Sequence, residues 1–154
     1  MQSQIVAQNR KAKFDYFLEE KYEAGLVLSG TEVKSLRQGH ASVAESHIIA
    51  EGDELFILNC YIPEYLEANR FNHQTRRPRK LLLHRKQINK LIGKVKTKGY
   101  TLIPTMIYFT EKNIAKVEVC LAKGKAKHDK RASVKEQEWQ REKQQIAKKE
   151  LSQI

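Results

Sequence analysis

Short apolar runs separated by turn residues are the feature that most restricts how this chain can fold. The run from Phe14 to Leu28 is rich in aromatic and β-branched residues, which is typical of one or two strands. Gly25 lacks a Cβ atom, so we expect the chain to bulge or bend there. Further along, the turn residues 51–53 separate two apolar runs, 46–50 and 55–62. Two runs joined in this way predict a β-hairpin.

A second hairpin is predicted from the runs 101–110 and 114–122, which flank Lys112 and Asn113. The second run alternates apolar and charged residues, as a half-buried strand does. An antiparallel sheet of this size usually hides its edges by curling into a barrel, and the OB-type barrel is a frequent nucleic-acid-binding form. The expected fold is therefore mainly β: residues 1–122 form a small OB-like antiparallel β-barrel with two or three helices.

Two helices are expected between the strands. Ser29 followed by Glu32 matches a capping box, so a short helix should cover residues 32–38 and stop at Gly39. A second helix should follow the leucines at 81–83, with an apolar stripe facing the core and a row of lysines facing outward. The apolar stripe consists of Ile88, Leu91, Ile92 and Val95, and the lysine row consists of Lys86, Lys90 and Lys94.

The composition changes after Ala122. Residues 123–154 contain ten Lys or Arg, five Asp or Glu, and a single aromatic residue, Trp139. Such a segment has too little apolar side chain to fold alone. Ser133 and Glu136 match a second capping box, and good helix formers follow it. We therefore expect residues 123–154 to be a basic C-terminal tail that is disordered when free and becomes helical against a partner.

The charge of the chain indicates a polyanionic partner. The sequence has 29 Lys or Arg against 18 Asp or Glu, a formal net charge of +11, which favours nucleic acid. There is no acidic residue between Glu67 and Glu111. Like charges this dense repel one another unless a counter-charge is present, so binding of RNA phosphates is favoured over a merely solvated face. The basic residues of this block are Arg70, Arg76, Arg77, Arg79, Lys80, Arg85, Lys86, Lys90, Lys94, Lys96 and Lys98.

Other classes of protein find little support. No apolar stretch approaches the roughly 18 residues of a membrane-spanning helix, and residues 1–10 lack the apolar core of a signal peptide, so we expect a cytoplasmic protein without a membrane partner. Cys60 and Cys120 stand far apart in strand-like runs, as buried free thiols do. The histidines show no metal-ligand spacing, and paired carboxylates do not converge, so no metal, cofactor or catalytic residue is indicated.

Several segments of the chain match the motifs of one known family in the same order. These segments are Asn9-Arg10-Lys11-Ala12, Glu23-Ala24-Gly25-Leu26, Gly30-Thr31-Glu32-Val33-Lys34-Ser35-Leu36-Arg37, Arg79-Lys80-Leu81-Leu82-Leu83-His84, Gly99-Tyr100-Thr101-Leu102-Ile103-Pro104, Gly124-Lys125 and Asp129-Lys130-Arg131. By these segments the chain resembles the SmpB family of SsrA-binding proteins. The resemblance spans the chain from about Asn9 to Trp139, which makes it far more specific than any single motif would be. One departure is Ala126, where the family often has a second lysine after Gly-Lys.

The resemblance implies a function in ribosome rescue. A protein of this family binds the tRNA-like domain of tmRNA and delivers it to stalled ribosomes for trans-translation. Its body takes the place of the missing anticodon arm, and its tail enters the empty mRNA path near the decoding region of the small subunit and becomes helical on the ribosome. The family further implies that elongation factor Tu and alanyl-tRNA synthetase act on the same RNA.

Candidate binding residues follow from the resemblance and from their charge. Cations position phosphates, and Asn9 can bond a base or sugar edge. We expect Asn9, Arg10 and Lys11 to form one RNA-facing patch with Lys34 and Arg37. The further RNA-binding candidates are Glu32, Arg79, Lys80, His84, Lys123, Lys125 and Lys127, and the residues expected to contact the ribosome are Asp129, Lys130, Arg131, Trp139 and Arg141.

Some alternatives remain open on the sequence. Glu32 is equally explained as the cap of its own helix, and Trp139 as a tertiary anchor or as a stacking partner for a ribosomal base. A basic OB-like ribosomal or translation protein that binds another structured RNA would also explain the charge and the fold. An RNA-processing enzyme would need turnover that depends on one titratable group, such as His84 or His128.

Overall fold

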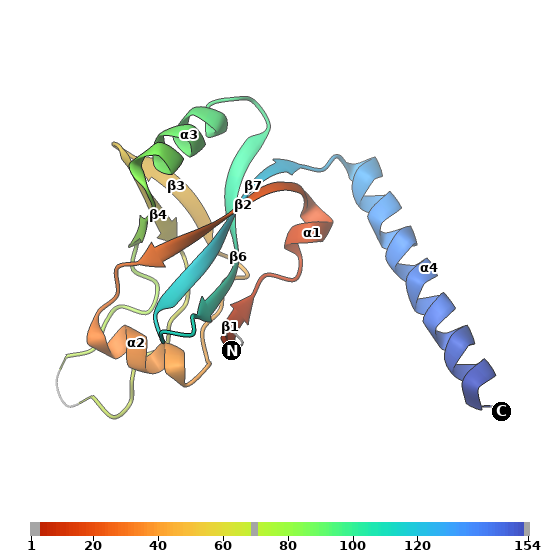
Figure 1. The fold of residues 1–154 in the computed structure, drawn as a ribbon, viewed down its shortest axis with the longest axis horizontal. Helices are drawn as coiled ribbons and strands as arrows, with labels where there is room; N and C mark the ends of the chain where they lie inside the picture. The colour runs from red at the N-terminus through yellow and green to blue at the C-terminus, as the bar shows by residue number, and fades with distance from the viewer. Residues whose placement is uncertain (1–3, 69–70, 153–154) are drawn as a thin grey trace.

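The computed structural model describes residues 4–68 and 71–152 of the chain, so Arg70 lies outside the described residues. Strands follow one another along the chain with four helices between or after them (Figure 1). The elements are β1 (Gln4–Gln8), α1 (Ala12–Asp15), β2 (Tyr16–Leu26), α2 (Gly30–Arg37), β3 (His47–Glu51), β4 (Glu54–Leu58), β5 (Arg79–Leu82), α3 (Arg85–Val95), β6 (Tyr100–Phe109), β7 (Ala115–Gly124) and α4 (Lys127–Ser152).

The strands close into the predicted antiparallel barrel. The sheet order is β1-β6-β3-β4-β5-β2-β7, and an additional β6–β7 pairing joins the ring. β1 lies outside this ring and pairs with the C-terminal half of β6. The long strands β2, β6 and β7 form the most extensive ladders, and closure leaves few unpaired edges. The inside of the barrel is filled by buried aliphatic side chains, among them Leu36, Leu55, Ile57, Leu81, Leu91, Ile107, Val117 and Leu121.

Both predicted hairpins are confirmed. β3 and β4 pair around a turn in which Gly52 has φ +62°, and β6 and β7 pair around a turn in which Asn113 has φ +63°. Glycine and asparagine tolerate this left-handed region better than other residues. The strands β1 and β5 and the short helix α1 had no counterpart among the predicted elements, because each is too short to show a strong periodic pattern of its own.

Gly25 is not the site of a bulge, contrary to the prediction. The register of β2 against β7 shifts between Leu18 and Glu20, whereas Gly25 pairs regularly with Lys116 on one side and Leu82 on the other. A Cβ atom at Gly25 would meet the Cβ of Leu82 at 3.2 Å. The glycine is therefore explained by the close approach of β5 and not by a bulge.

The predicted helices α2 and α3 are confirmed with small shifts at their ends. Both halves of the Ser29–Glu32 capping box are formed, and Gly39, just after α2, has φ +80°. In α3, Ile88 and Leu91 are buried while the lysine row Lys86, Lys90 and Lys94 is exposed. The helix thus packs inward on one face and presents cations on the other, as its sequence pattern indicated.

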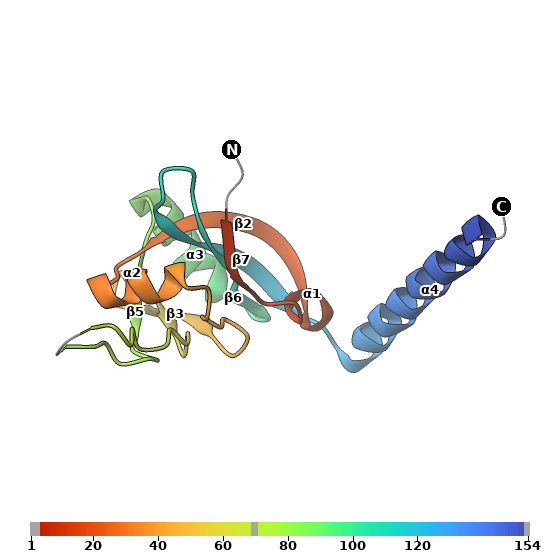
Figure 2. The ribbon, with the colours of Figure 1, turned by 90° about the horizontal axis from the view of Figure 1, so that it is seen from below.

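The tail is described as one helix, α4, that begins at Lys127, before the predicted capping box at Ser133, and projects away from the barrel (Figures 1 and 2). The predicted second capping box is wrong. Ser133 lies inside the helix and its hydroxyl donates to the carbonyl of Asp129 at 3.1 Å, while the Asp129 carboxylate accepts from the N–H of Ala126 at 3.3 Å. That the free tail is disordered stays a prediction. Over the described residues, no helix combines the length and apolar character needed to cross a bilayer.

Candidate nucleic-acid interface

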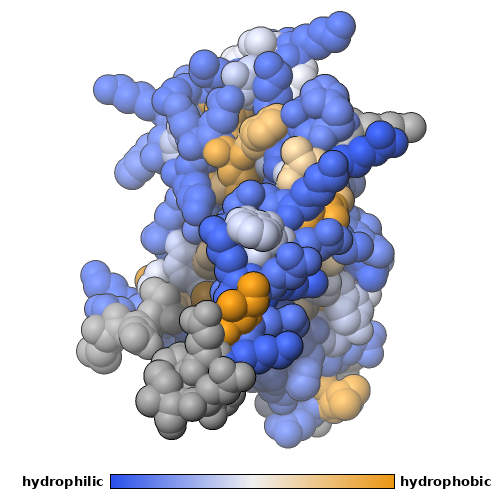
Figure 3. Space-filling view, turned by 90° about the vertical axis from the view of Figure 1, so that its right-hand side faces the viewer, coloured by the Kyte–Doolittle hydropathy of each residue, from blue (hydrophilic) through white to orange (hydrophobic). Residues whose placement is uncertain are grey.

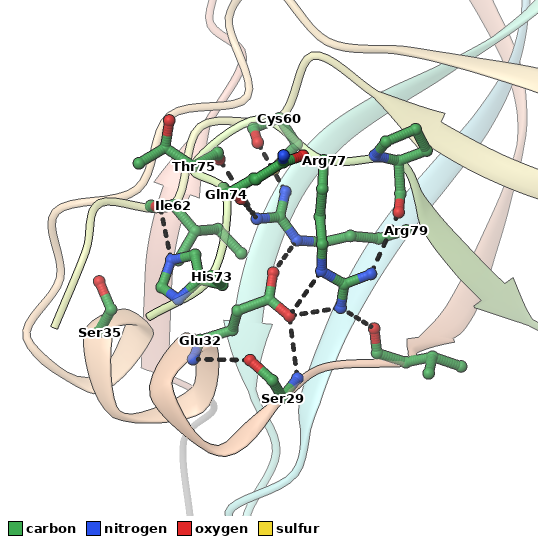
Figure 4. Close-up of polar contacts among 12 residues, drawn as sticks. Ser29, Glu32, Ser35, Cys60, Ile62, His73, Gln74, Thr75, Arg77 and Arg79 are labelled. Atoms are coloured by element: carbon green, nitrogen blue, oxygen red, sulfur yellow. Dashed lines mark hydrogen bonds and ion pairs between the residues drawn. The ribbon is translucent and has the colours of Figure 1, made fainter. Parts of the chain in front are cut away.

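A buried carboxylate with two arginines joins α2 to the start of β5 and the residues just before it (Figure 4). The side chains of Glu32 and Arg79 are both 0% exposed. Arg79 Nε donates to Glu32 Oε2, and Arg77 Nε donates to Glu32 Oε1 at 3.1 Å. Arg79 Nη1 donates to the carbonyl of Cys60 at 2.7 Å. Since every polar group here has a partner, the cluster is a structural tie between elements far apart in sequence.

The environment keeps Glu32 ionised. Burial by itself raises the pKa of Glu32, but hydrogen bonds from Arg77, from the N–H of Ser29 and from Arg79 outweigh it and hold the pKa below its ordinary value of 4.5. Buried beside each other, the Glu32 carboxylate and the Arg79 guanidinium have no surface to offer an RNA. The expectation that these two residues contact RNA directly does not fit their burial, and the capping alternative for Glu32 is the one that the geometry realises.

One exposed basic surface surrounds α2. Lys34 and Arg37 are exposed on this helix, and the Lys34 Nζ atom lies 5.7 Å from the centre of the Tyr65 ring. Arg77 is 31% exposed while it bonds Glu32, so it adds a cation at the edge of the same surface. The role of Arg77 is visible only in its tertiary pairing with Glu32, because nothing in the sequence distinguishes it from the other arginines of its block. We call Lys34, Arg37 and Arg77 the α2 patch.

A second surface surrounds α1 and the beginning of the tail. Asn9 is held in place, since its backbone N–H donates to the carbonyl of Thr105 at 2.7 Å and its Nδ2 to that of Pro104 at 3.5 Å. Arg10 and Lys11 beside it are exposed. Lys125 is tied to this region by its backbone N–H, which donates to the carbonyl of Asp15 at 3.0 Å. Lys123 is exposed near the end of β7, where its Nζ lies 5.9 Å from the centre of the Tyr100 ring and apart from the other residues. We call the set Asn9, Arg10, Lys11 and Lys125 the α1 patch.

The expected single patch is wrong, because the two surfaces lie apart. Figures 1 and 2 place α1 and α2 on opposite sides of the barrel along the longest axis of the molecule. The strand β2 runs between them for 11 residues, and an extended chain of that length spans about 35 Å at roughly 3.3 Å per residue. An RNA that contacts both patches must therefore pass along or around the barrel.

The basic block that lacks acids in sequence has acidic partners in space. Arg77 and Arg79 bond Glu32, and Glu54 pairs with Arg85 at 2.6 Å and with Lys80 at 3.8 Å. Lys80 is half-buried, and His84 is exposed directly before α3. Other strands thus supply much of the counter-charge that the sequence pattern assigned to phosphates. In the described part of the chain, no acidic side chain forms an ion pair with Lys86, Lys94, Lys96 or Lys98, and these remain cations for a ligand.

We expect the α3 lysines to act in binding and not in folding. Replacing Lys86 and Lys94 together by Gln should change the free energy of unfolding by less than about 0.5 kcal/mol, because both are exposed. Binding of structured RNA should weaken in a filter-binding assay. Lys90 is left unchanged because it pairs with Glu20 at 3.2 Å.

A charge-matched control separates a local effect from a general loss of charge. Replacing the exposed Lys112 and Lys135 by Gln removes the same charge elsewhere and should affect RNA binding much less. Equal weakening of RNA binding in the two double variants would show that the α3 lysines are not part of the interface.

The first turns of α4 contact the barrel and the residues just before the helix. Lys130 Nζ lies 3.5 Å from Asp15 Oδ1, and Lys125 Nζ donates to Ser133 Oγ at 2.7 Å. Asp129 and Lys130 are thus engaged within the chain, whereas Arg131, Trp139 and Arg141 are exposed. The side chain of Lys127 lies outside the described residues. Figure 3, which faces the side of α4, shows a mostly hydrophilic surface.

Clustered metal ligands and exposed thiols are not found among the described residues. Within 4–68 and 71–152, no three His, Cys, Asp or Glu residues come together as a possible metal site. Cys60 and Cys120 are buried free thiols, and burial raises the pKa of Cys60 to about 11. A thiol of this kind is a poor nucleophile.

Comparisons with known proteins identify the family of this chain. The model of the SmpB protein family matches residues 6–149. An SsrA-binding protein of Rickettsia bellii is 61% identical over 138 residues, covering 90% of this chain and 91% of the relative. One of Methylorubrum populi is 60% identical over 139 residues, covering 90% and 88%.

A solved structure extends the likeness to three dimensions. It is described by the words "tmRNA-SmpB: a journey to the center of the bacterial ribosome", and one of its chains superposes with a TM-score of 0.66 at 45% identity. The match covers 82% of this chain and 92% of that one. From the family match along nearly its whole length, this chain belongs to the SmpB family of SsrA-binding proteins.

Proposed function

We propose that this protein binds the tRNA-like domain of tmRNA and delivers it to stalled ribosomes for trans-translation. The observation that carries the proposal is the 45% identity, over 82% of the chain, to a protein described in complex with tmRNA and the bacterial ribosome. Elongation factor Tu and alanyl-tRNA synthetase would act on the same RNA, and the site of action would be the bacterial cytoplasm. Binding and positioning require no cofactor and no catalytic group.

The separation of the patches supports a division of labour. The α2 patch, with the free lysines of α3, provides cations for the phosphates of a folded RNA. The α1 patch lies where the barrel meets α4, with Lys125 bonded to the carbonyl of Lys13 and to Ser133. RNA held there would lie next to the base of the tail. The exposed Arg131, Trp139 and Arg141 are then the tail residues available to the ribosome.

We expect RNA binding to depend steeply on salt. Each neutralised phosphate releases counterions, with a slope of roughly 0.7 to 0.9 per contact in a plot of log K against log salt. Replacing Lys34 and Arg37 by Ala should lower both the affinity and this slope, and filter binding over a series of salt concentrations measures both. An unchanged slope would remove the two residues from the interface.

Sequencing of the RNA that co-purifies with the full chain tests the proposed function directly. Enrichment of tmRNA over ribosomal RNA and tRNA is the expected result. The alternative is a basic ribosomal or translation protein that binds another structured RNA, and it predicts enrichment of that RNA instead.

A further inference from the structure

A cavity of about 290 Å³ opens beside Asn9, between the β1–α1 connection and the outer surface of β2, β6 and β7. This volume is just below the roughly 300–1,000 Å³ of small-molecule sites, so it suits one ring system better than a whole nucleotide. Cations, a carboxylate and apolar side chains share the lining, which includes Arg10, Lys13, Lys21, Leu18, Met106 and Glu118.

The sheet is irregular at this cavity and nearly regular elsewhere. The register shifts between Leu18 and Glu20 in β2 and between Pro104 and Met106 in β6, and both shifts border the cavity. A third shift, between Ile5 and Ala7, occurs in β1, which pairs with the same stretch of β6. Bulges re-aim side chains and are over-represented next to functional sites. Their gathering here is what makes room for the cavity.

Glu118 lines this cavity, and one of its two carboxylate oxygens is engaged by neighbouring side chains. Its Oε1 accepts from the Thr105 hydroxyl at 2.8 Å and lies 3.7 Å from Lys21 Nζ. Thr105 is only 8% exposed, so its hydroxyl holds the Glu118 carboxylate from the buried side. Among residues 4–68 and 71–152, none donates a hydrogen bond to Oε2. A fixed carboxylate with one unused acceptor atom is suited to a ligand that carries an N–H group.

We propose that this cavity receives a single unpaired base of the bound RNA, and that it selects a base with an exocyclic amine. The amine donates to Glu118 Oε2, while the face of the ring packs on Leu18 and Met106, whose thioether suits aromatic contact. Arg10, Lys13 and Lys21 hold the phosphates on either side. Uracil is disfavoured because it has no exocyclic amine, and its one Watson–Crick-edge donor, N3–H, lies between two carbonyl oxygens that the carboxylate would repel.

Nucleotide titration of the full chain, followed by amide NMR shifts, tests the cavity without tmRNA. The probes are AMP, CMP, GMP, UMP and inorganic phosphate. We expect saturable shifts at residues 8–10, 105–106 and 118 with the three amine-bearing nucleotides, and binding of UMP weaker by about five-fold or more. Phosphate alone should not reproduce these shifts.

Two variants make the outcome specific. Glu118→Gln keeps an acceptor for Thr105 but replaces the charged carboxylate, so it should remove the preference over UMP. Met106→Trp should fill the cavity and abolish binding of all four nucleotides. Retained preference in Glu118→Gln, or equal shifts with phosphate alone, would overturn the proposal.

The assignment of this base to tmRNA rests on the proposed function. The cavity proposal and the proposed function can nevertheless fail separately. Selective nucleotide binding without tmRNA binding would leave the cavity assigned and refute the proposed RNA. Filter binding of tmRNA that is intact in Met106→Trp, together with no nucleotide shifts in the parent chain, would refute the cavity alone.

Discussion

Removal of residues 136–154 is expected to abolish peptide tagging on stalled ribosomes while tmRNA binding stays within about two-fold of the parent chain. The cut is placed there because the described contacts between α4 and the barrel are made by Lys130 and Ser133, which are retained. The removed part buries too little apolar surface to support the barrel. We expect the tail to be stabilised by a ribosomal channel that neutralises and packs it. Tagging on a truncated message and filter binding with tmRNA measure the two activities.

A proline substitution in the tail of the full-length chain tests whether the tail must be helical or only present. Gln140→Pro should reproduce the loss of tagging, since proline inside a helix costs about 3 kcal/mol. Gln140→Ala is the matched control and should tag normally. Normal tagging by the truncated protein, or loss of tmRNA binding along with tagging, would refute the division into an RNA-holding barrel and a ribosome-sensing tail.

Glu32→Ala is expected to destabilise the barrel by about 3–5 kcal/mol. Removing one partner of a buried ion pair leaves the other charge uncompensated, and here Arg79 would remain buried. Denaturant unfolding measures the change. Glu54→Ala is the control, because Glu54 is 28% exposed and its partner Arg85 is 52% exposed, so the loss there should be about 1 kcal/mol or less. Similar losses in both variants would show that the Glu32 cluster is not a structural tie.

The same cluster sets a pH dependence of known sign. The pKa of Glu32 is lowered in the folded chain, so its contribution to stability is fully present above the ordinary value of 4.5 and is lost as the pH falls through the lower, folded value. The parent chain should therefore lose stability more steeply below pH 4.5 than Glu32→Ala does. Unfolding curves at a series of acidic pH values measure this difference.

The local elements of this protein were predictable because their signals are local. The Ser29–Glu32 capping box, the apolar stripe of α3 and the turns before β4 and β7 all depend on residues within a few positions of one another. Alternation of apolar and polar residues was enough to indicate an antiparallel barrel. The resemblance of ordered motifs to the SmpB family was likewise readable along the chain, and the family match confirms it.

The arrangement of charges was decided only by the tertiary structure. The sequence from 68 to 110 contains no acid, yet Glu32, Glu54 and Glu20 reach its cations from other strands and helices. Arg79 looks like a phosphate ligand in sequence and is buried instead, because the barrel closes over the pair that it forms with Glu32.

The separation of the α1 and α2 patches follows from the length and direction of β2, and the cavity at Glu118 from bulges in strands distant along the chain. Charge and composition determined what kind of partner this protein binds. Which cations are free to bind it was decided by strand pairing, because electrostatic neutralisation depends on distance in space and not on separation in sequence.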